Sequence, residues 1–283
     1  MKTPRILLSE NKNQIQDEIR VSLLRRLIFE MLQAQGMDLY LDMDTVLSDE
    51  FIERYQTNKA RVLKDEPLGY VLGYEWFYGL KLKVNEHVLI PRSETEELAG
   101  HVSADVFDYF DQDVVIADIA TGSGALACAL KSDHAAATVI ASDISPAALK
   151  VAQANAKAHD LDIQFYQGDM GDPLIEAGLR FDVIVCNPPY IRKDEIIESS
   201  VKDFEPHLAL YGGDDGLHLY RKLLNQIPNL IKKRAMVAFE IGFDQKQALL
   251  DEINKRFERV RVEVVQDINQ KDRMFFMYFN LEL

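Results

Sequence analysis

The chain has 283 residues, a length that favours one large domain accompanied by a small one. Hydrophobic residues make up 47% and charged residues 28%, which is a globular composition and excludes a disordered chain. The formal net charge of −14 disfavours nucleic acid as the main partner, because phosphate binding usually relies on a basic excess. The apolar runs are too short to span a membrane, there is no signal-peptide core, and the two cysteines have no metal or redox spacing. We therefore expect a soluble, cytoplasmic protein.

Residues 1–65 are predicted to form a small helical domain. Apolar side chains recur every three or four positions between residues 15 and 32, which is typical of a helix with a wide buried face. A second helix is expected to begin after Ser48. The predicted apolar face of the first helix consists of Ile15, Ile19, Leu23, Leu24, Leu27, Ile28, Met31 and Leu32.

The segment 66–92 is predicted to be a linker that contains a β-hairpin. Apolar residues alternate with lysines after Gly79, as they do in a half-buried strand. Ser93 and Glu96 then fit the pattern of a capping box, which predicts a helix that extends to about Phe110.

Residues 93–283 are predicted to form the large domain, in which short apolar runs alternate with helical stretches. Ser145 followed by Pro146 is a typical helix start. The last run follows the preceding one with no room for a helix, so it should pair antiparallel. This order predicts a doubly wound, Rossmann-like α/β sheet with an antiparallel last strand. The predicted strands cover residues 114–117, 138–141, 163–166, 183–186, 236–241, 260–265 and 274–279.

The first of these strands leads into a glycine-containing turn at residues 118–124. Glycines allow a ligand to approach the backbone, and free amides at the helix start favour negative or polar groups. The next two strands end at Asp143 and Asp169, and Asp143 is placed to accept both hydroxyls of an adenosine ribose. A dinucleotide and S-adenosylmethionine (SAM) both remain candidates here. SAM carries an amino group, for which Asp118 offers a carboxylate.

Asn187, Pro188, Pro189 and Tyr190 follow the next strand, at the edge where open α/β sheets bind ligands. A planar amide or amino nitrogen is a poor nucleophile because its lone pair is delocalised. Its two N–H groups need two rigid acceptors, which the Asn187 side-chain oxygen and the Pro188 carbonyl can supply. The paired prolines stiffen the turn, and the Tyr190 ring can pack against the flat group. This motif favours SAM as the cofactor and a planar nitrogen as the methyl acceptor.

Seven stretches of the chain together resemble one known family. They cover residues 66–73, 88–96, 121–124, 187–191, 205–210, 212–217 and 240–242. With them, nearly the whole sequence is similar to the release factor glutamine methyltransferases, the HemK/PrmC family. The Asn-Pro-Pro-Tyr motif is shared with adenine and other amino methyltransferases, whereas the stretch 90–96 and the helical N-terminal domain are much narrower signals. The resemblance implies a class I SAM-dependent methyltransferase that modifies the side-chain amide nitrogen (N5) of glutamine in the Gly-Gly-Gln motif of class I peptide chain release factors, the proteins of translation termination.

The resemblance also suggests how the site residues are used. Asp118 and the turn would hold the methionine end of SAM, Asp143 the ribose, and Asp169 with Met170 the adenine. Catalysis would consist of positioning the glutamine, without a covalent intermediate and without a metal, since the histidines have no ligand spacing. The predicted cofactor-binding residues are Asp118, Ala120, Thr121, Gly122, Ser123, Gly124, Asp143, Asp169, Met170 and Asn187. The predicted catalytic residues are Asn187, Pro188 and, as a weak candidate for the base, Tyr190; together with Pro189 they form the predicted substrate site.

Three positions depart from the family pattern. Ala120 stands where the family usually has the first glycine of its cofactor turn, and Ser93 replaces a proline. Met170 occupies a position that is often aromatic in relatives, and it can cover the adenine by packing although it stacks less well. None of these changes removes a predicted acceptor, so we expect each to be tolerated.

Three other interpretations remain open at the level of sequence. A nucleic-acid amino methyltransferase of the adenine-N6 type would use the same acceptor motif on a flipped base. A dinucleotide-dependent oxidoreductase fits the glycine turn but leaves residues 187–190 without a role. A non-catalytic adaptor would bind the release factor without turnover. For the leading interpretation we expect residues 1–65 to recognise the release factor rather than merely extend the fold, and we expect a monomer with no stable nucleic-acid or membrane partner.

Overall fold

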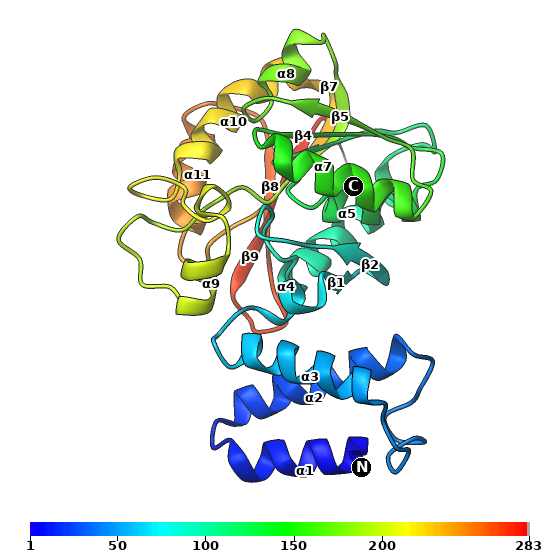
Figure 1. The fold of residues 1–283 in the computed structure, drawn as a ribbon. Helices are drawn as coiled ribbons and strands as arrows, with labels where there is room; N and C mark the ends of the chain where they lie inside the picture. The colour runs from blue at the N-terminus through cyan, green and yellow to red at the C-terminus, as the bar shows by residue number, and fades with distance from the viewer. Residues whose placement is uncertain (282–283) are drawn as a thin grey trace. The chain divides into compact units, whose positions relative to one another are not determined.

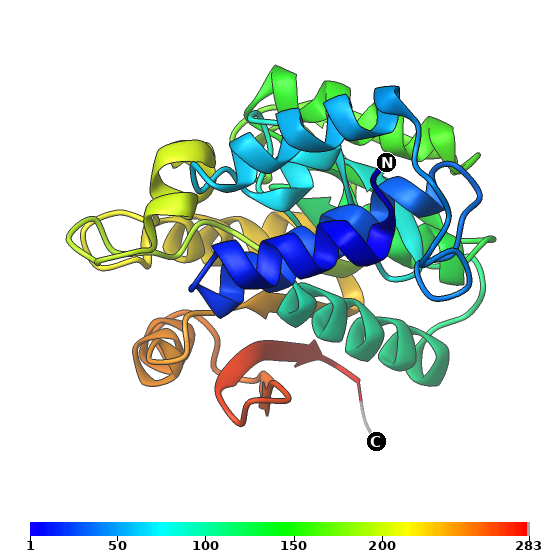
Figure 2. The ribbon, with the colours of Figure 1, turned by 60° about the horizontal axis from the view of Figure 1, so that its bottom comes forward.

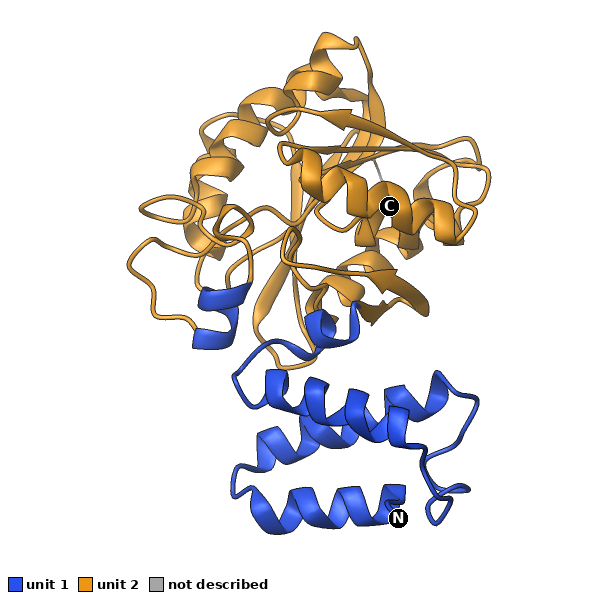
Figure 3. Cartoon of the chain, in the orientation of Figure 1, with its two compact units in different colours: residues 1–73, 198–204 blue, residues 74–197, 205–283 orange. Residues whose placement is uncertain are grey.

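The structure, a computed structural model, describes residues 1–281, and the chain divides into two compact units (Figure 3). Unit 1 consists of residues 1–73 and 198–204, and unit 2 consists of the rest of the chain. Within residues 1–281, none of the helices combines the length and apolar character needed to cross a bilayer.

Unit 1 is entirely helical, and Figures 1 and 2 both show α1, α2 and α3 lying side by side. A side-chain cap begins each of these helices, and Ser48 accepts the N–H of Phe51 at the start of α3, which confirms the helix predicted after Ser48. Its core contains large side chains such as Leu27 and Tyr55, both fully buried. The helices of unit 1 are α1 (Pro4–Gln14), α2 (Glu18–Gln33), α3 (Asp49–Val62), α4 (Leu68–Leu72) and α9 (Ser199–Phe204).

The apolar face predicted for residues 15–32 is only partly right. The Asp17 carboxylate accepts the N–H groups of Ile19 and Arg20, so α2 begins at Glu18. Ile15 therefore lies outside the helix, and Ile19 is 73% exposed because the first turn of α2 faces solvent. The buried part of the predicted face consists of Leu24, Leu27, Ile28, Met31 and Leu32.

The hairpin and the helix after it open unit 2. Strands β1 (Tyr74–Phe77) and β2 (Leu80–Lys83) pair antiparallel around Gly79, as the alternation of residues predicts. Helix α5 (Ser93–Tyr109) follows, but the predicted capping box does not form. Ser93 is already helical and its hydroxyl donates to Glu94, while the Glu96 carboxylate accepts the backbone N–H of Tyr78 in the hairpin.

A seven-stranded sheet forms the centre of unit 2, with the strand order β5-β4-β3-β6-β7-β9-β8. Strands β3 to β7 are parallel, and β9 pairs antiparallel with β7 and β8, which confirms the predicted doubly wound sheet with an antiparallel last strand. The strands are β3 (Val115–Ile119), β4 (Thr138–Asp143), β5 (Ile163–Gln167), β6 (Phe181–Cys186), β7 (Ile231–Glu240), β8 (Arg261–Gln266) and β9 (Asp272–Phe279).

Helices cover both faces of this sheet (Figure 1). Helices α5, α6 and α7 pack on one face, and α8, α10 and α11 pack on the other. Successive strand residues serve opposite layers, so Ile116 of β3 belongs to the first apolar cluster and Ala117 to the second. The remaining helices are α6 (Ala125–Asp133), α7 (Pro146–Ala158), α8 (Asp172–Glu176), the 3₁₀ helix η1 (His207–Ala209), α10 (His218–Leu230) and α11 (Lys246–Asn254).

Candidate active site

The strand order places two predicted motifs next to each other. The chain runs outward from β3 to β5 and then returns to β6, which pairs with β3 on its other side. Ile119 is in register with Cys186, so the glycine turn after β3 and Asn187 after β6 begin at neighbouring strand ends. In open α/β sheets, ligands bind at the carboxyl ends of the strands at such a reversal of order.

A cavity of about 330 Å³ lies at this edge of unit 2. Its size and its largely apolar wall are typical of a site for a small organic ligand. Ten predicted site residues line it: Asp118, Ala120, Thr121, Gly122, Ser123, Asp143, Asp169, Met170, Asn187 and Pro189. The segment before α5, the first turn of α5 and the loop around η1 also contribute to the wall, with His87, Val88, Leu89, Pro91, Thr95, Pro206, Leu208 and Ala209.

The turn between β3 and α6 has an unusual backbone. Ala120, Gly122 and Gly124 have φ values of 60°, 57° and 81°, in the left-handed region that favours glycine. Gly124 also packs against α7, since a Cβ on it would lie 3.0 Å from the Cβ of Ala152. Ala120 adopts the glycine-like conformation despite its methyl group, so the turn keeps its course and carries some strain.

Asp118 is the carboxylate best suited to a cationic ligand group. Its Oδ2 accepts from the Thr121 hydroxyl and from the N–H of Ala127 at 3.0 Å. Its Oδ1 is buried and has no hydrogen-bond partner among the described residues, although Asp118 lines the cavity. Burial raises the pKa of Asp118 to about 7. A cavity wall with an unpaired buried carboxylate oxygen fits the ammonium group of SAM.

Asp143 holds the turn while remaining on the cavity wall. Its Oδ2 accepts the N–H of Gly122 and its Oδ1 accepts the N–H of Ser145, both at 2.8 Å. Burial raises the pKa of this carboxyl, and the two N–H groups act to lower it. Each carboxylate oxygen has a second lone pair, so these bonds leave acceptor capacity for ribose hydroxyls.

Asp169 and Met170 line the same cavity from the turn after β5. The Oδ2 of Asp169 forms an ion pair with Lys222 at 2.7 Å, and Asp169 remains on the cavity wall. Met170 is buried and has φ 55°, and its carbonyl accepts from the Ser142 hydroxyl at 3.0 Å. The Met170 backbone is held by this hydrogen bond, and its side chain offers the cavity an apolar surface that is suited to a flat ring.

The Asn187 side chain lies at the centre of a polar cluster. Its Nδ2 donates to the Thr95 hydroxyl oxygen at 3.0 Å and to Oε2 of Glu240 at 2.9 Å. The Tyr190 hydroxyl donates to the other oxygen of Glu240 at 3.2 Å. In the described part of the chain, no donor reaches the side-chain oxygen of Asn187 or the carbonyl of buried Pro188. Neither oxygen therefore has a donor within the described residues, and of the two residues Asn187 lines the cavity.

Two residues of this cluster have shifted titration behaviour. Burial raises the pKa of Glu240, whereas the Thr95 hydroxyl and the positive charge of Arg273 act to lower it. Burial and the Glu240 charge raise the pKa of Tyr190 well above that of a free phenol. A phenol that holds its proton this firmly is a poor general base, so the geometry gives Tyr190 a supporting role toward Glu240.

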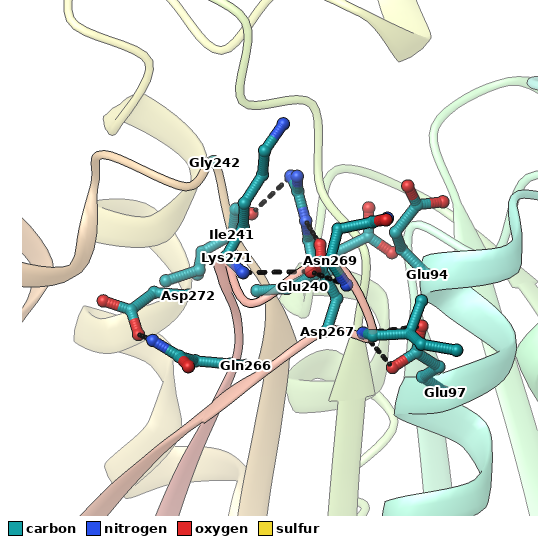
Figure 4. Close-up of polar contacts among 12 residues, drawn as sticks. Glu94, Glu97, Glu240, Ile241, Gly242, Gln266, Asp267, Asn269, Lys271 and Asp272 are labelled. Atoms are coloured by element: carbon teal, nitrogen blue, oxygen red, sulfur yellow. Dashed lines mark hydrogen bonds and ion pairs between the residues drawn. The ribbon is translucent and has the colours of Figure 1, made fainter.

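The turn that joins β8 to β9 lies next to Glu240, one member of this cluster (Figure 4). Asp267 accepts the N–H groups of Asn269 and Lys271 at 2.9 and 3.0 Å, and its other oxygen pairs with Arg273. Arg273 in turn donates to the carbonyl of Ile241, directly after β7. This network fixes the end of β7.

The structure brings most predicted site residues to one cavity, but not all of them. Pro188, Tyr190 and Gly124 are not part of the cavity wall. Two residues for which the sequence suggested no role, Thr95 and Glu240, contact Asn187 directly. Both lie in stretches that carry the family resemblance, and that is the only signal in the sequence that pointed to them. Among residues 1–281, no group of histidine, cysteine and acidic side chains could hold a metal ion.

The sheet order, the glycine turn, the acids at the carboxyl ends of β3 to β5 and the acceptor motif after β6 define a SAM-dependent methyltransferase. Residues 98–211 match the Methyltransferase small domain, and residues 11–73 match the PrmC N-terminal domain. The chain is 39% identical over 249 residues to the release factor glutamine methyltransferase of Bacillus cereus, covering 87% of this chain and 88% of that one. The same enzyme of Bacillus subtilis is 39% identical over 250 residues, covering 86% and 87%. The chain belongs to the release factor glutamine methyltransferase family.

Solved structures agree with this fold. The hMettl16 catalytic domain, solved in complex with an RNA hairpin, is 14% identical and superposes with a TM-score of 0.55 over 83% of this chain and 84% of that one. A methyltransferase from Pyrococcus furiosus is 15% identical, with a TM-score of 0.51 over 79% and 98%. At these identities the similarity concerns the fold alone.

Proposed function

We propose that this protein methylates the side-chain amide nitrogen of the glutamine in the Gly-Gly-Gln motif of class I peptide chain release factors. The observation that supports the proposal is a pair of acceptors without a donor, the Asn187 side-chain oxygen and the Pro188 carbonyl, of which Asn187 lines a cavity that fits SAM. A primary amide has two N–H donors, and the pair matches them. The net charge of −14 favours a protein over a nucleic acid as the substrate.

The cavity residues would hold the cofactor in the way their geometry suggests. Asp118 would bind the ammonium group, Asp143 the ribose, and Met170 would cover the adenine. Bound SAM supplies an activated methyl group on a sulfonium. The charge on Asp118, opposite the ammonium, would fix the orientation of the cofactor in the cavity.

Asn187 and Pro188 act on the substrate nitrogen. Two acceptors that hold both N–H groups set the plane of the amide and the direction of its nitrogen. As the nitrogen gains positive charge, its N–H groups become stronger donors, so the same two oxygens stabilise the transition state more than the ground state. After the methyl transfer, the nitrogen loses one of these protons to water. Tyr190 is not assigned as the base, because its pKa is raised.

We further propose that the helical N-terminal segment, predicted as residues 1–65, recognises the release factor, and that the enzyme acts in the cytoplasm as a monomer without a stable nucleic-acid or membrane partner. The match of residues 11–73 to the PrmC N-terminal domain supports a role tied to this family of substrates. Removal of this segment should raise KM for the release factor while SAM affinity stays the same.

The test is methylation of a purified class I release factor by the full chain and labelled SAM, with the modified residue located by mass spectrometry. Asn187→Ala should lower kcat/KM at least about 100-fold, because the amide loses one of its two anchors. Asn225→Ala, at an exposed asparagine, is the matched control. A release factor whose Gly-Gly-Gln glutamine is replaced by alanine should accept no methyl. Transfer to RNA or DNA instead of the factor would refute the proposal and favour a nucleic-acid methyltransferase.

A further inference from the structure

We propose that Thr95 and Glu240 are positioning residues, which hold the Asn187 amide so that its oxygen, and not its NH2 group, faces the substrate. This inference rests on the proposed function. An asparagine amide has nearly the same shape after a half turn about its last bond. Only one of these two orientations presents an acceptor to the glutamine, so a site built on Asn187 needs a means of selecting it.

The hydrogen bonds around Asn187 have a single direction. A carboxylate accepts hydrogen bonds and cannot donate them, so the Thr95 hydroxyl donates its hydrogen to Oε2 of Glu240. The Thr95 oxygen can then only accept from Asn187, at 3.0 Å, and Oε2 of Glu240 accepts the second N–H at 2.9 Å. Both N–H groups of Asn187 are used, and its oxygen is left for the substrate.

A flipped Asn187 would be strongly disfavoured. Its oxygen would then face the carboxylate of Glu240 and the lone pairs of Thr95. Two hydrogen bonds would be lost, and the oxygens, all of them acceptors, would repel one another. The negative charge of Glu240 thus sets the direction of the whole cluster.

Glu240 is itself held in place from several sides. It lies at the end of β7 and is 2% exposed. Tyr190 donates to its Oε1 at 3.2 Å, and the Tyr220 hydroxyl donates to its backbone carbonyl at 2.7 Å. Figure 4 shows Glu240 close to the β8–β9 turn, with Glu94 and Glu97 on the neighbouring helix α5. Burying a carboxylate is costly, and three side-chain donors compensate it here.

The same contacts predict what Glu240→Gln does. Tyr190 would continue to donate to the glutamine oxygen at the Oε1 position, which turns the new NH2 group toward Thr95 and Asn187. The hydrogen bonds between this NH2 group, Thr95 and Asn187 then run in the opposite direction, and the Asn187 amide turns its NH2 group toward the substrate. The variant keeps size and shape, so it changes direction without creating a cavity.

The experiment uses the full-length enzyme and a purified class I release factor. We expect Glu240→Gln to lower kcat about 100-fold and Thr95→Val about tenfold, with the dissociation constant for SAM unchanged within twofold. Thr95→Ser keeps the hydroxyl and should restore activity to within threefold of the wild type. Glu97→Gln is the matched control, because Glu97 lies on the same helix as Thr95 but accepts the N–H of Ile268 and does not contact Asn187.

A second readout separates orientation from simple structural support. A second substrate is a release factor in which glutamate replaces the Gly-Gly-Gln glutamine. Its carboxylate has only acceptors and would face the acceptor oxygens of Asn187 and Pro188, so it should bind poorly to the wild-type enzyme. In the Glu240→Gln variant, the NH2 group of Asn187 faces the substrate and should improve binding of the glutamate factor. The dissociation constant of the glutamate factor divided by that of the glutamine factor should therefore fall at least fivefold relative to the wild-type enzyme. Glu97→Gln should leave this ratio unchanged.

The outcomes separate the inference from the proposed function. Wild-type enzyme that does not methylate the factor refutes the proposed function and the inference with it. If the wild type is active and the kcat values of Glu240→Gln and Thr95→Val lie within threefold of it, the inference alone is refuted. The inference is also refuted if Glu240→Gln loses kcat but the ratio of the dissociation constants for the glutamate and glutamine factors does not change. If Glu240→Gln fails to fold, as judged by its melting temperature, the contrast between Thr95→Val and Thr95→Ser decides.

Discussion

Asp118→Asn is the most informative perturbation of the cofactor site. In the free protein, burial raises the pKa of this carboxyl from the usual 3.8 to about 7. At 1.36 kcal/mol for each pKa unit, ionising Asp118 costs about 4 kcal/mol more in the fold than in water. A cationic group bound at its unpaired Oδ1 recovers much of that cost.

SAM affinity should therefore depend on pH in a defined way. Below about pH 7 Asp118 becomes protonated, so the affinity falls by up to tenfold for each pH unit. Above about pH 8 the amino group of the ligand loses its proton, so the affinity falls again. Asp118→Asn should weaken binding about 100-fold at pH 7.5, which corresponds to about 3 kcal/mol for a charge-assisted hydrogen bond, and should remove the acidic limb.

The stability of the free enzyme should change with the opposite sign. Because the folded pKa is raised, the contribution of Asp118 is fully present below about pH 4 and is lost as the pH rises toward 7. The stability of Asp118→Asn relative to the wild type, measured by urea unfolding, should therefore be greater at pH 8 than at pH 5.

Isothermal titration calorimetry with SAM between pH 5.5 and 8.5 measures the binding side of the prediction. Asp113→Asn, at an exposed aspartate before β3, is the control and should titrate like the wild type. A wild-type affinity that stays constant from pH 6 to 8, or an Asp118→Asn variant that binds SAM as tightly as the wild type, would refute the reasoning.

Two backbone substitutions in the cofactor turn should have opposite effects. Gly124→Ala forces a side chain into the left-handed region with its Cβ 3.0 Å from that of Ala152, and should lower the free energy of unfolding by about 2 kcal/mol. Ala120→Gly relieves the same kind of strain and should raise it by up to about 1 kcal/mol, after the greater chain entropy of glycine is counted. Urea unfolding measures both, and changes of the same sign would contradict the account of the turn.

Much of the architecture could be predicted from local patterns. The apolar runs and their spacing indicated the parallel strands, and the missing helix before the last run indicated the antiparallel strand β9. The side chains of successive strand residues point to opposite faces of the sheet, whichever elements pack there. A strand can therefore be predicted from its own few residues. Helix starts were less secure: Ser145 caps α7 as predicted, whereas Ser93 does not cap α5, because Glu96 bonds to the hairpin.

The cofactor residues were predictable for a related reason. Asp118 and Asp143 lie in the last two residues of β3 and β4, Asp169 follows β5, and parallel strands bring these ends to one edge. Only the structure shows how each carboxylate is engaged. Asp118 keeps an unpaired oxygen, whereas Asp169 is paired with Lys222, far along the chain.

The individual strands, the glycine turn and the acceptor motif are readable in the sequence alone, because each depends on residues close together in the chain. The orientation of Asn187 was decided only by the tertiary structure. Its partners, Thr95 and Glu240, lie 92 and 53 residues away, and they reach it because α5 begins, and β7 ends, beside the end of β6. The direction of a hydrogen bond depends on which donors and acceptors the fold brings together, and the spacing of residues along the chain carries no record of that.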